Sequence, residues 1–76
     1  MPHVVIKLLA GRPEATKQHL ADEVTQAVMA SIDCTEDAVS VDIQDVGKSE
    51  WADQVYTPEI APHLARLYKK PGYRLA

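Results

Sequence analysis

The sequence predicts an α+β fold in which two parallel strands lie under one long helix and short helices follow at the C-terminus. Three observations support it. Apolar residues alternate with mixed ones over residues 3–9, apolar residues recur every four positions over 20–32, and alternation returns over 39–44. A strand, a crossover helix and a second strand in one sheet are almost always parallel and right-handed.

The first strand is predicted over residues 3–9. Its even positions are all apolar, namely Val4, Ile6 and Leu8. Because side chains alternate between the two faces of a strand, these three residues give it one face for a core. The odd positions mix polar with apolar residues, so the opposite face is semi-polar. The strand is expected to end at Ala10-Gly11.

The helix is expected to begin at Pro13, which suits the first helical position because its missing N–H costs nothing there. A stripe of apolar residues then recurs every four positions, at Leu20, Val24, Val28 and Ile32. Polar residues fall on the opposite side, so the pattern predicts an amphipathic helix of about five turns. A polar turn, DCTED, separates it from the second strand.

In the second strand Val39, Val41 and Ile43 alternate with polar residues, as in a half-buried strand. Two parallel strands and one helix cannot enclose a core, and the semi-polar face of the sheet needs a partner. A chain of 76 residues also buries a smaller fraction of its surface than a larger domain would. Self-association, which small folds without other cross-links often use, is therefore expected.

The last third of the chain predicts short helices. Ser49 and Glu50 could begin one that runs through Trp51, and Thr57-Pro58 has the pattern of an N-cap followed by a proline at the first helical position. Pro62 lies too far inside a helix that starts at Pro58, so that helix either kinks or begins near Ala61. Its later part has an apolar edge at Leu64, Leu67 and Tyr68, and the stop signal is Lys-Lys-Pro-Gly at 69–72.

The composition is that of one globular domain spanning residues 1–76. The net charge of −3 gives no indication of a nucleic-acid or anionic-membrane partner. Cys34 is the only cysteine, which excludes an internal disulfide and fits a reducing compartment. No signal peptide or membrane-spanning segment is recognised, and a cytoplasmic location is expected.

Pro2 is the candidate with the clearest chemistry. At the first residue of a strand a proline is tolerated for structural reasons alone. If Met1 is removed, however, the Pro2 nitrogen stops being an amide and becomes a free secondary amine. Such a group is a base that can be neutral near pH 7.

The motifs that accompany Pro2 resemble a known family. They are Gly11-Arg12, the Ser-Ile-Asp turn at 31–33, Trp51, Pro-Glu-Ile-Ala-Pro at 58–62 and Lys-Lys-Pro-Gly-Tyr at 69–73. Together they resemble the tautomerase superfamily, specifically the 4-oxalocrotonate tautomerase family and its dimeric PptA-type branch. The resemblance covers the whole chain. It implies the tautomerase/MIF-like fold, in which dimerisation completes a four-stranded sheet.

The resemblance also implies a chemistry. Members use the N-terminal proline, exposed by methionine removal, as general base and acid that moves a proton between the oxygen and carbon ends of an enol, without cofactor or metal. Pro2 matches that proline. Arg12 matches an arginine that holds a substrate carboxylate, although it could be a solvated arginine beside a helix start. Trp51 matches an aromatic wall of the pocket, although it could be a core or interface anchor.

One position departs from the family pattern. Ser40 stands where hexameric members have a second arginine that stabilises the enolate oxygen and adjoining carboxylate. Loss of such a partner costs about 3–4 kcal/mol, so weak activity on dicarboxylates is expected. Four residues could be recruited instead: His3, Lys7, His63 and Tyr73. The resemblance favours small 2-hydroxy-2-enoates or phenylenolpyruvate-like acids as substrates.

Two alternatives stay open at the level of the sequence. The chain could be a catalytically idle dimer that binds a small acid or serves as a scaffold. It could also be a hydratase or dehalogenase of the same superfamily, in which a protonated proline acts as an acid toward added water. Those reactions need an acidic group that activates water, and the sequence does not place Asp42 or Glu50 in the pocket.

Overall fold

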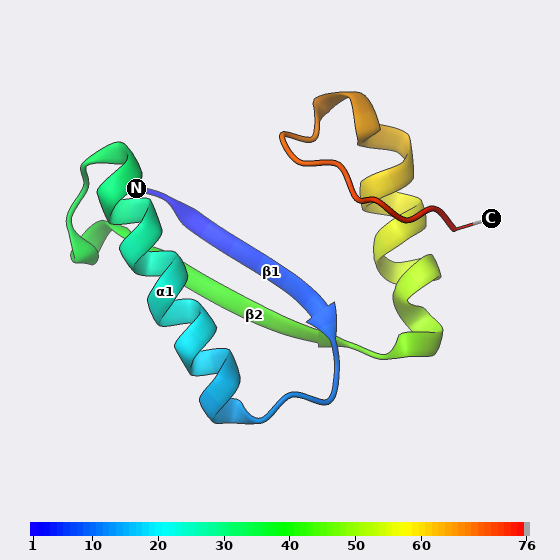
Figure 1. The fold of residues 1–76 in the computed structure, drawn as a ribbon, viewed down its shortest axis with the longest axis horizontal. Coiled ribbons are helices and arrows are strands. Elements are labelled where there is room, and N and C mark those ends of the chain that lie inside the picture. The colour runs from blue at the N-terminus through cyan, green and yellow to red at the C-terminus, as the bar shows by residue number, and fades with distance from the viewer. Residues whose placement is uncertain (76) are drawn as a thin grey trace.

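A computed structural model describes residues 1–75 of the chain. The elements in chain order are β1 (His3–Leu9), α1 (Glu14–Ile32), η1 (Glu36–Ala38), β2 (Ser40–Val46), η2 (Lys48–Glu50), η3 (Ala52–Ile60) and η4 (Ala61–Arg66). The strands and α1 form one unit, and residues 47–75, the C-terminal arm, lie beside it (Figure 1). This order confirms the predicted β-α-β unit followed by short helices.

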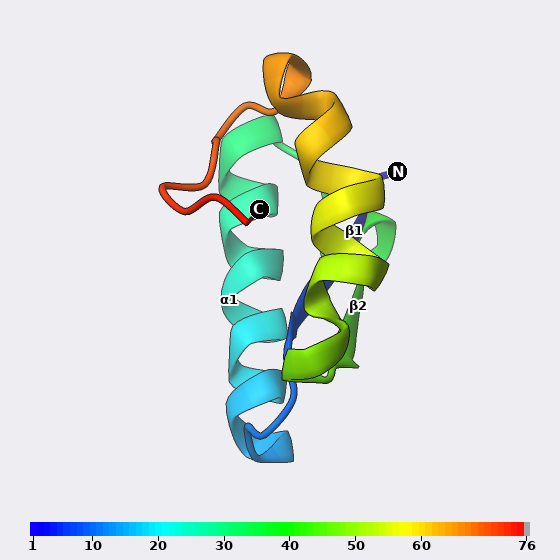
Figure 2. The same ribbon diagram turned by 90° about the vertical axis from the view of Figure 1, so that its right-hand side faces the viewer.

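The two strands form a parallel sheet. His3 lies opposite Ser40 at one end and Leu9 lies opposite Val46 at the other. The backbone N–H of Ser40 also donates to the carbonyl of Pro2 at 3.2 Å, so the pairing reaches one residue beyond the start of β1. The helix α1 runs along one face of this sheet (Figure 2). The predicted parallel pairing under a helix is confirmed.

The apolar face of the sheet lies toward α1. The even-numbered apolar residues of β1 are half-buried, as are Val41 and Ile43 of β2. On α1 the first three residues of the predicted stripe are half-buried too: Leu20, Val24 and Val28. Ile32 is 60% exposed, because it is the last residue of the helix and no described part of the chain covers it.

The start of α1 differs from the prediction by one residue. Pro13 has φ −63° and ψ 155°, an extended conformation, so it is the N-cap and the helix begins at Glu14. Its fixed φ suits either position, and the backbone ψ decides between them. At the other end Asp33 takes a left-handed conformation with φ 56°, which stops the helix.

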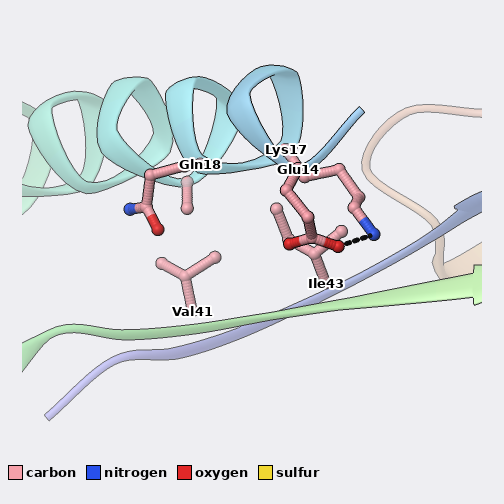
Figure 3. A pocket seen from close by; sticks show the side chains of 6 residues that line it. Glu14, Lys17, Gln18, Val41 and Ile43 are labelled. Carbon is pink, nitrogen blue, oxygen red and sulfur yellow. Dashed lines mark ion pairs between the residues drawn. The ribbon is translucent and has the colours of Figure 1, made fainter. Parts of the chain in front are cut away.

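Ion pairs fasten the first turn of α1 to β2. The ammonium of Lys17 lies 2.8 Å from the carboxylates of both Glu14 and Asp45. These hydrogen bonds, first to Asp45 and then to Glu14, raise the pKa of Lys17. A cavity of about 250 Å³ lies beside the pairs, between the helix and the apolar residues Val41 and Ile43 (Figure 3).

The C-terminal arm corrects the predicted helix boundaries. The single turn η2 begins at Lys48, one residue before the expected start, and η3 runs through Thr57-Pro58 instead of beginning there. Pro58 offers no N–H to the usual i→i+4 ladder, and η3 adopts the wider i→i+5 spacing at this place. A new helix begins at Ala61, as one of the two expected alternatives had it, with Pro62 in its first turn.

The last helix is shorter than predicted. It ends at Arg66, and the backbone at Leu67 is extended, with φ −69° and ψ 129°. Leu67 and Tyr68 therefore do not continue an apolar helical edge, and the side chain of Tyr68 is fully exposed. Among residues 1–75, no helix combines the length and the apolar character needed to cross a membrane.

The core of one protomer is thin. Among the described residues only Val46, Val55 and Tyr56 are buried, where the C-terminal arm meets the end of β2. The Cα radius of gyration is 14.1 Å, whereas a compact domain of this length has about 11 Å. The accessible surface of 5822 Å² likewise exceeds the value of about 4,600 Å² expected for a monomer of 8.4 kDa. The protomer thus exposes about 1,200 Å² more than a compact monomer would.

Candidate active site

Pro2 lies at the head of β1, half-buried and held by the sheet. Its carbonyl accepts the Ser40 N–H, so β2 fixes its backbone without using its nitrogen. Met1, in contrast, is fully exposed. Removal of Met1 therefore costs the protomer no packing, and it leaves the Pro2 nitrogen at the end of an ordered strand.

A polar pair stands next to Pro2 on the face of the sheet that points away from α1. His3 Nδ1 lies 2.6 Å from Ser40 Oγ, and the two residues are direct cross-strand neighbours. The sequence suggested His3 as one of four candidate replacements for an arginine, but it did not indicate this pairing. The strand register, which places residue 3 opposite residue 40, is the signal that identifies it.

Arg12 lies beyond the other end of β1. Its Nη1 donates to the carbonyl oxygen of Leu9 at 2.9 Å, which turns the guanidinium back toward the strand end. Gly11 makes this turn with φ +126°, a conformation that L side chains rarely adopt. The Gly-Arg motif therefore has a conformational reason, since the glycine lets the chain turn so that the arginine side chain reaches back to the end of β1.

Trp51 lines an apolar pocket at the same end of the sheet as Arg12. The pocket has a volume of about 310 Å³, and its other walls are Leu9, Tyr73 and Leu75. Leu9 thus joins the two predicted substrate-binding residues, since its side chain lines the pocket and its carbonyl holds Arg12. A guanidinium and an apolar pocket that share Leu9 as a neighbour would suit a ligand with a carboxylate and an apolar group.

Tyr73, suggested by the sequence as one of four possible replacements for the absent arginine, is a wall of this pocket. Its hydroxyl oxygen accepts the indole N–H of Trp51 at 2.9 Å, and its ring centroid lies 5.6 Å from that of Tyr56. The C-terminal tail thereby folds back over η3. The indole N–H is satisfied within the protein, so Trp51 offers its ring rather than a donor to a ligand.

Leu9 links Arg12 and Trp51 at one end of β1, since its carbonyl accepts from Arg12 and it lines the pocket with Trp51, whereas Pro2 lies at the other end. Pro2 precedes β1 and Arg12 follows it, and the seven residues of the strand span about 23 Å at about 3.3 Å each. One protomer alone therefore does not unite the three predicted site residues. Any site that contains all three has to draw Pro2 from one copy and the pocket from another.

Lys7 is already engaged in an ion pair. Its ammonium pairs with the carboxylate of Glu59, which links β1 to η3 across the face opposite α1. A lysine held in this way has its charge largely compensated, so it is a weaker candidate than His3 for the role of the absent arginine. His63, half-buried in η4, belongs to the C-terminal arm.

Comparison with known proteins assigns the chain to a family. The model of the tautomerase enzyme family matches residues 2–56, from Pro2 to the middle of η3. The chain therefore belongs to the tautomerase enzymes, and it is an isomerase.

Individual relatives narrow the assignment. A probable tautomerase of Xylella fastidiosa is 41% identical over 73 residues, which are 96% of this chain and 89% of the relative. Tautomerase PptA of Cronobacter sakazakii is 38% identical over 76 residues, covering 99% of this chain and all of the relative. The predicted resemblance to the PptA-like proteins is confirmed.

Solved structures agree with the fold. A 4-oxalocrotonate tautomerase isozyme from Methylibium petroleiphilum superposes with a TM-score of 0.64 at 38% identity, covering 66% of this chain and 81% of the other. YwhB, a homologue of 4-oxalocrotonate tautomerase, gives 0.60 at 34% identity and covers 62% and 77%. The fold is thus that of the 4-oxalocrotonate tautomerase family.

Proposed function

We propose that this tautomerase interconverts the enol and keto forms of small 2-hydroxy-2-enoates or phenylenolpyruvate-like acids, without a cofactor. Pro2, freed by removal of Met1, accepts the proton of the enol hydroxyl and delivers it to the neighbouring carbon. The O–H bond breaks and the C–O bond becomes C=O, while the C=C bond becomes single and a C–H bond forms at its far carbon. The observation that carries the proposal is the half-buried Pro2 at an ordered strand end, with its carbonyl engaged and Met1 exposed.

The nitrogen of a free Pro2 has suitable properties for this step. A terminal amine titrates near pH 8, and partial burial favours its neutral form. A base whose pKa lies close to the working pH is the most effective proton shuttle, and it contributes about 10²–10⁴-fold to the rate. Pro2 then acts first as base and afterwards as acid, so one group is sufficient for the proton transfer.

Arg12 and the Trp51 pocket are proposed to bind the substrate. The planar guanidinium of Arg12 suits a carboxylate. The pocket, lined by Leu9, Trp51, Tyr73 and Leu75, suits an apolar or aromatic substituent. A phenyl ring needs such walls, whereas a second carboxylate would lie unpaired against them. This favours phenylenolpyruvate-like acids over dicarboxylates.

We propose that the working form is a cytoplasmic homodimer. The protomer exposes about 1,200 Å² more surface than a compact monomer of its mass would. This area is larger than the roughly 800 Å² that each partner buries in an interface of standard size. A second copy would also supply the Pro2 that is missing at the Arg12 end of each protomer. Light scattering should give twice the 8.4 kDa mass of the protomer. A mass of one protomer at micromolar concentration would contradict the dimer.

Hydratase and dehalogenase chemistry has less support from the side chains. It requires a carboxylate that activates water near the base. Asp42 accepts a hydrogen bond from Gln44, Glu50 accepts one from Gln54, and neither carboxylate lines the Trp51 pocket. Both acids are exposed in the protomer.

The proposed reaction is tested with the Pro2→Ala variant. Decay of the enol absorbance of phenylenolpyruvate reports the rate, and intact mass confirms that Met1 is absent. The variant keeps a terminal amine but not the proline ring, and we expect kcat/KM to fall at least about 10²-fold. A wild-type value in Pro2→Ala would overturn the proposal.

A further inference from the structure

His3 and Ser40 form a side-chain pair beside the proposed base. Their Nδ1 and Oγ atoms are 2.6 Å apart, and the residues face each other across the parallel strands. Ser40 also donates its backbone N–H to the carbonyl of Pro2 at 3.2 Å. The pair is therefore fixed relative to Pro2 through both strands, since His3 follows Pro2 in the chain and Ser40 bonds to it.

Such a pair always has one outward hydrogen-bond donor. If Nδ1–H of His3 donates to Ser40 Oγ, the hydroxyl proton of Ser40 is free to donate onward. If the hydroxyl instead donates to Nδ1, the Nε2 atom of the imidazole carries the proton and donates. Both side chains belong to exposed residues. Either arrangement of the shared proton thus leaves an N–H or O–H donor available to a ligand.

The other polar groups on this face of the sheet are engaged elsewhere. Lys7 pairs with Glu59, and Asp42 accepts a hydrogen bond from Gln44. Both lie farther along the strands from Pro2 than His3 and Ser40 do, and Asp42 would repel a negative charge. Among the described residues of this face, the pair is therefore the group best placed to donate to an oxygen near Pro2.

We propose that the His3–Ser40 pair donates a hydrogen bond to the substrate oxygen that becomes negative when Pro2 removes its proton. This inference rests on the proposed function of Pro2. A donor aimed at developing charge lowers the barrier more than it tightens substrate binding. The pair offers donor atoms rather than the fixed charge of a guanidinium, so it supports one oxygen without attracting a second carboxylate as strongly as an arginine does.

Single variants test the pair against a purely structural role. Ser40→Ala and His3→Phe should each lower kcat about 10- to 100-fold on phenylenolpyruvate, with KM changed less than about threefold. Ser40→Thr retains the hydroxyl and should keep most of the activity. Gln44→Ala is the matched control, because this residue lies on the same face of β2, is exposed and makes one side-chain hydrogen bond. Its kcat should match the wild type.

The double variant His3→Phe/Ser40→Ala decides whether the two residues act as a unit. Its kcat should equal that of the worse single variant, because removal of one partner already breaks the pair. Losses that multiply, or a wild-type kcat in Ser40→Ala while Pro2→Ala shows its expected loss, would overturn this inference alone. Full activity in Pro2→Ala, or no tautomerase activity in the wild-type protein, would overturn the proposed function and this inference with it.

Discussion

Tyr73 should be the residue that fastens the C-terminal tail to the rest of the arm. It is 46% exposed, so about half of its side chain is covered by its neighbours. It contacts the ring of Tyr56 and accepts the indole N–H of Trp51. Because a tyrosine buries about 150–250 Å² when fully enclosed, the covered part is about 100 Å².

The cost of removing this side chain follows from these contacts. At about 25 cal/mol per Å², loss of the covered area in Tyr73→Ala costs about 2.5 kcal/mol of unfolding free energy. Tyr73→Phe keeps the ring and loses only the hydrogen bond to Trp51, which is worth about 0.5–1.5 kcal/mol. The alanine variant should therefore be the less stable of the two by at least about 1 kcal/mol.

Urea unfolding measures both values at one protein concentration, which must be fixed if the chain is a dimer. Trp51 is the only tryptophan, so its fluorescence reports the environment of the pocket directly. We expect the emission of the folded Tyr73→Ala protein to shift toward that of a solvent-exposed indole. A Tyr73→Ala variant as stable as the wild type, with unchanged emission, would refute the assignment of Tyr73 as an anchor of the tail.

Three further predictions concern other parts of the molecule. Gly11→Ala should lower the unfolding free energy by about 1–2 kcal/mol in urea titrations, because φ is +126° at this residue and a side chain is strained there. An unchanged unfolding free energy would contradict this backbone conformation. Arg12→Ala should raise KM for an enol acid more than Arg12→Lys does, because lysine keeps the positive charge; an unchanged KM in Arg12→Ala would argue against a carboxylate contact. The Lys17 ion pairs raise the pKa of its ammonium, so the stability that they add is fully present below pH 10.5 and is lost as pH rises through the higher pKa of the folded state. Lys17→Met should remove this alkaline loss from a plot of unfolding free energy against pH, and an unchanged plot would refute the stabilising role of the ion pairs.

Much of the fold could be predicted because it depends on local patterns. The apolar alternation of Val4, Ile6 and Leu8 marks β1, and the four-residue repeat from Leu20 marks α1. A strand, helix and strand in this order then allow little besides a parallel, right-handed unit. Ile32 and Pro13 show the limits of the same signals, because exposure and the ψ angle at a helix end depend on tertiary surroundings.

The C-terminal arm was harder to predict for a physical reason. Thr57-Pro58 has the composition of a helix start, but η3 passes through it with a wider turn, which packs Val55 and Tyr56 into the core. Tertiary burial there outweighs the local capping preference. In the candidate site, the Trp51–Tyr73 bond joins residues 22 positions apart, and no local pattern indicates such a contact.

We propose that a free, partly buried secondary amine at Pro2 moves the proton. The most direct test of this role compares the 76-residue chain that retains Met1 with the form that begins at Pro2, both on phenylenolpyruvate and each verified by intact mass. The form that begins at Pro2 should turn over substrate, at a rate that rises as the amine loses its proton. The form with Met1 should be inactive, because an amide nitrogen is not a base. Equal turnover by the two forms would contradict the role of the Pro2 nitrogen as the base.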